Sequence, residues 1–320
     1  MKIIFIGEEP VKTAPTLTWA NCLKNVGANY TYIDLNKINT KYWIKEVLNS
    51  NIIICQWYAV IPGYEMRQLA IASLMGRAVI RKWSGSDVLY TINDIESCKS
   101  TKILNNITAL NLTSEHIGLV QELATININC ALTQQVVTGV TTKNTPLVKG
   151  KSVLAYLPDT RYEFYGRIYI ENLIKDYPNI NFIIIADTKH ALNKYSNVTS
   201  LGWVDDMDPV WNKTGLLIRI TEHDGFPRSV VEALARGKYV IHNREFDGVW
   251  YAANQEEIKF CFERFINSNS VNTAGLDSVN EIIDGRSSLQ LLKTLEKTKV
   301  NLFKRIISLF YVTYLTFKKY

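Results

Sequence analysis

Residues 216–243 read LLIRITEHDGFPRSVVEALARGKYVIHN, and this stretch predicts the fold of the half of the chain that contains it. Residues 216–220 form a short apolar run, which is typical of a strand buried in a parallel sheet. Residues 221–228 bring Asp, Gly and Pro together and predict a turn. Residues 229–236 place valine, leucine and alanine at helical spacing, and Gly237 follows where a helix C-cap is expected. The order is therefore strand, turn, helix and a second strand.

The turn carries charged side chains at a position where open α/β sheets bind ligands. Asp224 and Arg228 lie there, together with Glu222 and His223. The unpaired amides and the dipole of the following helix favour an anion such as phosphate. Glu232 lies one to two turns into this helix. Its carboxylate and that of Asp224 can therefore accept hydrogen bonds from two parts of one polyhydroxylated ligand.

The stretch resembles the signature of the retaining glycosyltransferases of family 4, which usually reads EGFGxPxxEAxAxGxPVI. The resemblance implies the GT-B fold, in which two Rossmann-like, doubly wound α/β domains with parallel sheets face each other across a cleft. It also implies that the C-terminal helices cross back to the first domain. By position, Asp224 would contact the hydroxyls of a donor sugar, and Glu232 would hold the ribose of its nucleotide. Asp224 departs from the family's Glu, and Pro227 replaces the second Gly and removes one amide donor.

The resemblance further implies that the start of the helix binds the diphosphate of the donor. The leaving nucleotide gathers negative charge in the transition state, so fixed cations and helix N-termini stabilise it. The residues at this position are Gly225, Phe226, Arg228 and Ser229.

A second loop is expected to contribute to the same site. Residues 158–166 read PDTRYEFYG, and the family commonly supplies an Arg and a Lys from this loop. Arg161 matches the Arg, and a guanidinium can pair with phosphate oxygens in a bidentate manner. Tyr165 stands in place of the Lys. Arg219, Arg228 or a lysine from the other domain is the expected substitute.

Residues 202–204, Gly-Trp-Val, match the family's segment whose backbone contacts the nucleobase, so Trp203 and Val204 are candidates for that contact. Residues 205–208, Asp-Asp-Met-Asp, could suggest a divalent metal, but they more readily start a short helix. The family normally needs no metal. We therefore expect no metal site and no cofactor apart from the nucleotide-sugar substrate.

Candidate residues in the first half are less specific. Asp87 ends a Gly-Ser-Asp segment that follows a strand and resembles the family's Gly-Thr-Asp, which lines the cleft. Gln56 precedes a Trp where many relatives have His-Trp, and a neutral amide does not relay protons near pH 7. On position alone, three residues after the first strand are candidates for contacting the acceptor or a donor phosphate: Glu8, Glu9 and Lys12.

Composition describes a folded protein that meets anions. The chain has 320 residues, of which 47% are hydrophobic and 21% charged, with a formal net charge of +6. Nucleotide diphosphates, lipid phosphates and nucleic acids would each suit this charge. The resemblance to the glycosyltransferases favours a nucleotide diphosphate as the anion and predicts no nucleic-acid partner. The five cysteines are scattered singly, which favours reduced thiols and a cytoplasmic location. The start of the chain does not resemble a secretory signal.

Both halves of the chain alternate short apolar runs with helical patterns, which predicts two parallel sheets. Gly7 does not open a GxGxxG fingerprint, so a dinucleotide oxidoreductase loses its main support. We predict an acceptor domain over residues 1–140, a linker over 141–151, a nucleotide-sugar domain over 152–288 and a helical tail over 289–320.

The tail is expected to form a helix with apolar residues along its length and basic residues at its ends. One interpretation is structural: the tail packs on the N-terminal domain. The other is an interfacial helix that binds the anionic head groups of a membrane. The two interpretations are compatible.

Together these features predict a retaining, metal-independent hexosyltransferase. It would use a nucleotide-diphosphate sugar and a glycan or lipid-linked glycan acceptor in surface polysaccharide biosynthesis, in the cytoplasm and peripherally on the inner face of the membrane. One alternative is a degenerate partner that binds such ligands without turnover, as the departures at positions 224, 165 and 56 suggest. The other is a GT-B epimerase or phosphorylase, because the fold alone does not separate these activities.

Overall fold

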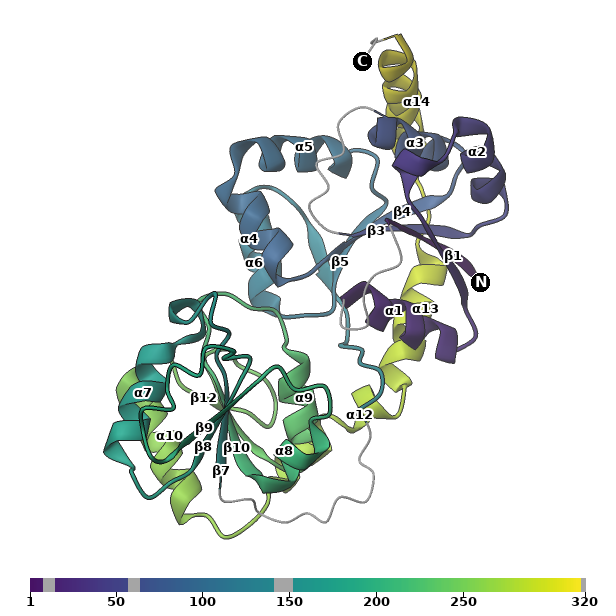
Figure 1. Cartoon of the computed structure of the whole chain (residues 1–320). Coiled ribbons are helices and arrows are strands. Elements are labelled where there is room, and N and C mark those ends of the chain that lie inside the picture. Colours follow the sequence, from purple (N-terminus) through teal and green to yellow (C-terminus); the bar gives the residue numbers. More distant parts are fainter. Residues whose placement is uncertain (8–14, 57–63, 141–151, 318–320) are drawn as a thin grey trace. The chain divides into compact units, whose positions relative to one another are not determined.

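The structure of the protein is a computed structural model that describes residues 1–7, 15–56, 64–140 and 152–317. These residues form two compact units (Figure 1). The first unit comprises Met1–Thr138 and Asp284–Tyr320, and the second comprises Gly139–Ile283. The chain therefore leaves the first unit once and returns to it near its C-terminal end. The expected linker, 141–151, lies outside the described residues.

The first unit is built on a six-stranded sheet in the order β2-β1-β3-β4-β5-β6, and all neighbouring strands are parallel. From the β1–β3 pair the chain extends the sheet in both directions, which is the doubly wound arrangement. Strands buried on both faces read as nearly continuous apolar runs, as β3 does. The strands are β1 (Lys2–Ile6), β2 (Asn29–Ile33), β3 (Ile52–Gln56), β4 (Ala78–Trp83), β5 (Leu110–Thr113) and β6 (Cys130–Leu132).

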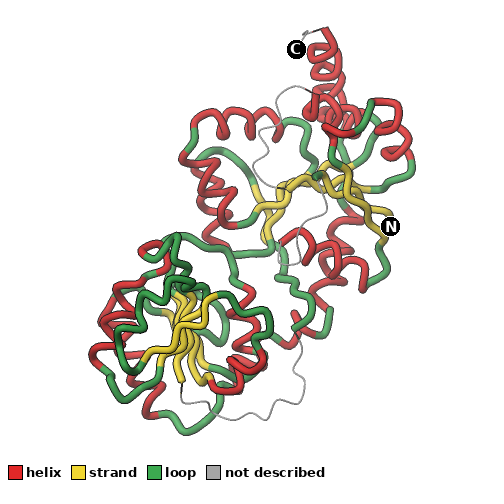
Figure 2. The backbone as a smooth tube through the Cα atoms, viewed as in Figure 1, coloured by secondary structure: helices red, strands yellow, loops and turns green. Residues whose placement is uncertain are grey.

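Helices cover both faces of this sheet (Figure 2). On one face, Trp43 of α2 and Leu69 of α3 join the core side chains of β1 and β3. On the other, Trp19 of α1 packs in a second cluster. A smaller cluster around Trp83 holds α4 and α6. The helices are α1 (Pro15–Asn25), α2 (Thr40–Leu48), α3 (Tyr64–Leu74), α4 (Gly85–Asn93), α5 (Ile95–Asn105), α6 (Ile117–Thr125), α13 (Arg286–Lys297) and α14 (Leu302–Phe317).

The C-terminal helices return to the first unit, as expected. Leu291 of α13 enters the core cluster on the α1 side of the sheet, and Ile307 of α14 packs on the cluster on the α3 side. The prediction of one helix over 289–320 was wrong, because the chain breaks between α13 and α14. Thr298 adopts an extended conformation with φ −72° and ψ 124°, and the Asn301 side chain accepts a hydrogen bond from the Lys304 amide, which caps the next helix.

The second unit contains a six-stranded parallel sheet in the order β12-β11-β10-β7-β8-β9. From β7 the chain passes to β8 and β9 on one side, and it later returns to add β10, β11 and β12 on the other. The strands are β7 (Ser152–Tyr156), β8 (Phe182–Ile185), β9 (Val198–Gly202), β10 (Thr214–Arg219), β11 (Tyr239–His242) and β12 (Trp250–Tyr251).

The helices of the second unit also lie on both sides of the sheet, with α7 and α10 on one side and α8 and α9 on the other (Figure 1). Ile170 of α7 and Phe262 of α10 belong to the core cluster on the first side. The helices are α7 (Arg167–Asp176), α8 (Asp208–Lys213), α9 (Arg228–Leu234), α10 (Gln255–Asn267), α11 (Thr273–Ser278) and α12 (Asn280–Ile283).

The stretch at 216–243 folds as predicted into strand β10, a turn, helix α9 and strand β11. Gly237 has a φ of +64°, and the amide of Lys238 donates to the carbonyl of Ala233 at 2.9 Å, so the chain ends the helix in the left-handed conformation that glycine favours. Among the helices in the described part of the chain, none combines the length and apolar character needed to span a bilayer.

Candidate functional site

The candidate site lies at the carboxyl edge of the second sheet, where β7 and β10 are neighbours. The chain continues from β7 to β8 on one side and from β10 to β11 on the other, so the loops after these two strands diverge. Open α/β sheets bind ligands at such a topological switch point. The loop after β7 carries Arg161 and the loop after β10 carries Asp224, so two of the predicted residues lie at one edge of the sheet.

Asp224 is bound to Arg219, the last residue of β10. The guanidinium donates to Asp224 Oδ2 from Nη2 at 2.6 Å and from Nε at 3.2 Å. The other carboxylate oxygen, Oδ1, accepts a hydrogen bond from the Gly225 amide at 3.0 Å. The side chains of Arg219 and Asp224 are 11% and 22% exposed, so this ion pair is partly shielded from water.

Two tyrosine rings flank the same guanidinium. The Arg219 Cζ atom lies 4.9 Å from the ring centroid of Tyr156 and 5.3 Å from that of Tyr165. The two rings meet edge to face, with centroids 5.1 Å apart. Burial raises the pKa of Tyr165 above its ordinary value, so the phenol stays neutral at pH 7. Arginine on an aromatic face is held in place without losing its charge. No motif in the sequence pointed to the contribution of Tyr156.

The two loops are tied together through their backbones. The Glu222 amide donates to the Phe164 carbonyl at 2.9 Å. Gly166 has a φ of +66°, and a Cβ atom there would lie 2.9 Å from the Cβ atom of Ile220. Only glycine allows both this backbone conformation and this close approach. The Arg161 Cζ atom lies 4.1 Å from the centroid of the Phe164 ring, so an aromatic ring of the same loop packs against this guanidinium.

Helix α9 carries the remaining residues of the motif. Arg228 Nε donates to Glu232 Oε1 at 2.7 Å along the helix. Ser229 Oγ is buried and has no hydrogen-bond partner among the described residues. The Phe226 ring packs edge to face on Phe246, with centroids 4.2 Å apart. The structure therefore brings Asp224, Gly225, Phe226, Arg228, Ser229 and Glu232 together on one turn and helix.

His242 lies beside Arg219, because the two residues are partners in the register of β10 and β11. Its ring is fully buried, and Nδ1 accepts a hydrogen bond from the Arg244 amide at 3.1 Å. Burial lowers the pKa of His242 to about 3, so the ring is neutral at pH 7. Nε2 then carries the proton, yet it has no partner among the described residues. The sequence analysis did not identify His242 as a candidate hydrogen-bond donor. Its position at the end of a predicted strand, where ligands bind, was the available signal.

The predicted nucleobase segment follows β9, which is separated from β7 by β8. Trp203 is 65% exposed, and its Nε1 donates to Asp205 Oδ1 at 3.1 Å. The acidic run after it starts helix α8 at Asp208, as the sequence indicated, and Asp208 pairs with Arg236. The described residues contain no group of three His, Cys, Asp or Glu side chains placed to hold a metal ion. The role of Trp203 and Val204 stays a prediction.

In the first unit, Asp87 is buried and caps helix α4. Its Oδ1 accepts hydrogen bonds from the amides of Ser84 at 2.8 Å and Val88 at 3.0 Å. Burial raises the pKa of Asp87 to about 7, against the opposing charges of Lys82 and Arg81. A direct ligand contact by this carboxyl stays a prediction. Gln56 ends β3. Glu8, Glu9 and Lys12 lie outside the described residues.

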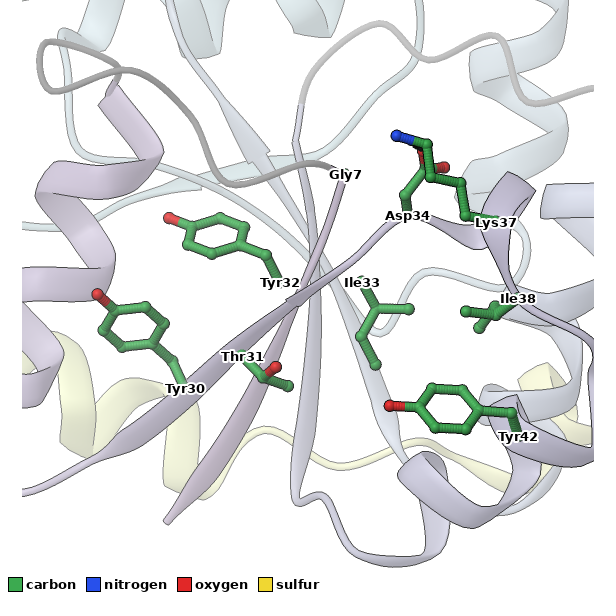
Figure 3. Close-up of a pocket in the computed structure, with 9 residues that line it drawn as sticks. All are labelled: Gly7, Tyr30, Thr31, Tyr32, Ile33, Asp34, Lys37, Ile38 and Tyr42. Carbon is green, nitrogen blue, oxygen red and sulfur yellow. Dashed lines mark ion pairs between the residues drawn. The ribbon is translucent and has the colours of Figure 1, made fainter.

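The first unit also has a surface pocket of about 610 Å³ along the edge strand β2 (Figure 3). It reaches the carboxyl ends of β1 and β2, where Gly7 and Asp34 lie. Tyr30 and Tyr32 point to one side of the strand, and Tyr42 approaches from α2 on the other. Asp34 forms an ion pair with Lys37 at 3.6 Å. The pocket therefore offers aromatic faces together with charged hydrogen-bonding groups.

No model of a known protein family matches this sequence, and no curated protein matches it in a sequence comparison. Solved structures do match the fold. HepE of Anabaena, in complex with UDP and glucose, has a TM-score of 0.64 and 14% identity over 93% of this chain and 100% of that chain. Sucrose-phosphate synthase of Thermosynechococcus elongatus has a TM-score of 0.62 and 11% identity over 92% and 98%.

A third similar structure is the apo form of WaaB, a lipopolysaccharide outer core galactosyltransferase. It has a TM-score of 0.52 and 14% identity over 97% of this chain and 99% of that chain. At these identities the likeness concerns the fold. With its two doubly wound parallel sheets and its returning C-terminal helices, the chain has the GT-B fold.

Proposed function

We propose that this protein transfers a hexose from a nucleotide-diphosphate sugar to a glycan or lipid-linked glycan, with retention of the anomeric configuration. The observation that carries the proposal is the pair of adjacent loops at the switch point of the second unit. These loops, the end of β10 and helix α9 hold two arginines, Arg161 and Arg219, together with the carboxylates of Asp224 and Glu232. The GT-B fold of glycosyltransferases such as WaaB supports this interpretation.

The arginines would hold the diphosphate of the donor. Negative charge builds on this group as the sugar–phosphate bond breaks, and a fixed cation in a partly desolvated site stabilises that charge. Arg219 meets this need because its side chain is only 11% exposed and two tyrosine rings pack on its guanidinium. One of these rings belongs to Tyr165, which stands where the family has its lysine. We therefore assign the role of that lysine to Arg219.

The carboxylates would hold hydroxyl groups. Asp224 already accepts hydrogen bonds from Arg219 and Gly225, but each carboxylate oxygen can accept more than one. A sugar hydroxyl can therefore bind without displacing Arg219. Glu232 would accept from the ribose diol, with Arg228 at 2.7 Å orienting its carboxylate.

The first unit would bind the acceptor. Its pocket along β2 combines the rings of Tyr30 and Tyr42 with the Asp34–Lys37 ion pair. Aromatic rings with a polar edge, next to charged groups, suit a ligand that has apolar faces and many hydroxyls. The likeness to a lipopolysaccharide core galactosyltransferase supports a role in surface glycan assembly.

The first test is the binding of nucleotide diphosphates. A thermal-shift and calorimetric panel should include the diphosphates UDP, GDP, ADP and dTDP and the monophosphate CMP, each with and without magnesium. UDP is the first choice because HepE binds it. We expect one nucleotide diphosphate to stabilise the protein independently of magnesium. Glu232→Ala should abolish this effect, whereas Glu256→Ala, which removes an exposed acid of the same unit, should preserve it.

The second test is turnover with the matching labelled sugar nucleotides and candidate glycans. Transfer with the same anomeric configuration in the product, established by NMR, would support the proposal. Isomerisation of the sugar nucleotide without an acceptor would assign an epimerase instead. Tight binding without any turnover would support the second candidate function, a protein that binds the nucleotide sugar or glycan without reacting. The hydrogen bonds that Asp224 already accepts from Arg219 favour this alternative.

A further inference from the structure

Helix α14 has two unlike faces. Ile307, Tyr311 and Val312 pack against the core cluster that includes α3, and Ser308 between them is fully buried. The opposite face presents large apolar side chains to solvent at the spacing of a single helical stripe. These side chains and their exposed fractions are Leu302 71%, Phe303 69%, Ile306 45%, Leu309 50%, Phe310 70% and Tyr314 59%.

Single exposed apolar residues are ordinary on protein surfaces, whereas a contiguous patch of them usually marks a binding surface. The exposed face of α14 is such a patch, because its members follow one another along the helix. Other exposed large residues, such as Phe260 of α10 at 68%, belong to helices with mixed surfaces. The packed face of α14 accounts for its attachment to the first unit, but it does not account for the apolar side chains that face solvent.

The net charge of the chain is concentrated in the sequence segment that contains this helix. Residues 297–320 contain six of the 36 Lys and Arg residues and none of the 30 Asp and Glu residues. The rest of the chain therefore has thirty of each sign, and the whole net charge of +6 resides in this segment. In the described part, Lys297 and Lys299 are exposed just before the helix, and Arg305 is exposed on it.

We propose that α14 binds the surface of an anionic lipid bilayer, with its apolar face in the head-group region and the exposed basic residues Lys297, Lys299 and Arg305 against lipid phosphates. An apolar stripe with Phe and Leu and a basic fringe is typical of helices that lie in the plane of a membrane. A 16-residue helix is about 24 Å long, which suits lying on the bilayer. A second copy of this chain is the less favourable occupant, because it would bring two segments of charge +6 together.

The proposal does not depend on the transfer reaction. It would, however, hold the first unit at the membrane, because α13 and α14 are both packed into that unit. An acceptor linked to a lipid would then meet the unit that we propose to bind it.

The test is flotation of the full chain with phosphatidylcholine vesicles, with and without phosphatidylglycerol. We expect binding to the anionic vesicles only, and weaker binding at high salt. The variant Phe303→Ser/Phe310→Ser should reduce partitioning by about tenfold or more, since two rings leave the head-group region. Its matched control is Phe260→Ser, which removes an equally exposed ring from the second unit and should not change binding.

A charge variant tests the same surface without changing its apolar face. Lys297→Gln/Lys299→Gln should weaken binding to anionic vesicles by about tenfold. The control Lys189→Gln/Lys213→Gln removes two exposed lysines of the second unit and should leave binding unchanged. Equal binding by the wild type and the phenylalanine variant would overturn the proposal. So would equal binding to neutral vesicles, or a dimer in sedimentation that Phe303→Ser/Phe310→Ser dissociates.

Discussion

The guanidinium of Arg219 donates two hydrogen bonds to a single oxygen of Asp224, Oδ2, from Nη2 at 2.6 Å and from Nε at 3.2 Å. Arg219 ends β10 and Asp224 lies midway along the turn that leads to α9, so the ion pair ties this turn back to the strand. A diphosphate that binds here must share Arg219 with a carboxylate. Under the proposed function, Asp224 would lower the affinity of the site for the anion and supply an acceptor for the sugar, and mutation can separate the two effects.

Arg219→Met should weaken the binding of a nucleotide diphosphate by about 10- to 100-fold, the usual effect of losing hydrogen bonds to a charged group. The binding of the parent nucleoside should change little, because it lacks the phosphates. Calorimetry with both ligands measures this difference. Arg264→Met is the control, since Arg264 also stacks on an aromatic ring, Trp250 at 4.5 Å. Equal losses for nucleoside and diphosphate would contradict a role for Arg219 in phosphate binding.

Asp224→Asn should have opposite effects on binding and transfer. Removing one negative charge beside Arg219 should tighten nucleotide diphosphate binding by about fivefold, equivalent to roughly 1 kcal/mol. The transfer rate should fall, because an amide is a poorer acceptor for the sugar hydroxyls than a carboxylate. Asp208→Asn, which breaks the pair with Arg236 on the same unit, should alter neither quantity. Tighter binding with undiminished transfer would exclude Asp224 from the sugar contact.

The sequence predicted the local parts of this site. The spacing of apolar residues, the turn residues and Gly237 predicted β10, α9 and β11, because each of these signals depends only on residues that are close in sequence. The Arg219–Asp224 pair is also short in range, but nothing in the pattern shows that Asp224 turns back to the strand. The Tyr156 contact depends on the pairing of β7 with β10, which brings together residues from distant parts of the chain.

Two other residues mark the limit of sequence reasoning. Asp87 stands three residues after Ser84, which is the spacing of a capping box, so its capping role could be inferred. The burial of Asp87 could not be inferred in this way, because it depends on the packing of α4 onto the sheet. Thr298 interrupts the predicted C-terminal helix although the apolar pattern continues on both sides. The break reflects the need of α13 and α14 to reach opposite faces of one sheet.

Gly166→Ala should destabilise the protein by more than the cost of its backbone conformation. A residue with a Cβ atom at a φ of +66° costs about 1 kcal/mol. The clash with Ile220 at 2.9 Å adds roughly 1–3 kcal/mol, because it forces the two site loops apart. Gly202→Ala is the control, since its φ is +65° but its nearest neighbour would lie at 3.9 Å. Equal losses in the free energy of unfolding in urea would show that the loops are not tightly apposed.

Asp87→Asn should change the pH dependence of stability. The pKa of Asp87 is raised to about 7 in the folded protein, whereas an unfolded aspartate titrates near about 3.9. The folded state therefore binds more protons between these values. The contribution of Asp87 to stability is complete below the unfolded pKa and is lost as the pH rises through 7, by up to roughly 1.4 kcal/mol per pH unit. An asparagine does not titrate, so the variant should gain stability relative to the wild type from pH 4 upwards. Parallel urea-unfolding profiles from pH 5 to 8 would contradict this assignment.

The assignment of the missing lysine to Arg219 has a direct test, because Tyr165 occupies the position of that lysine and its ring lies 5.3 Å from Arg219 Cζ. Tyr165→Lys alone places two cations together and should lower stability. In the Arg219→Met background, the new lysine replaces the lost cation. It should therefore raise the affinity for a nucleotide diphosphate by about tenfold relative to Arg219→Met alone. Tyr165→Leu in the same background removes the ring without adding charge and should restore nothing. If the lysine also fails to restore affinity while the double variant remains folded, Arg219 does not act on the phosphates, and Arg161 or Arg228 becomes the candidate.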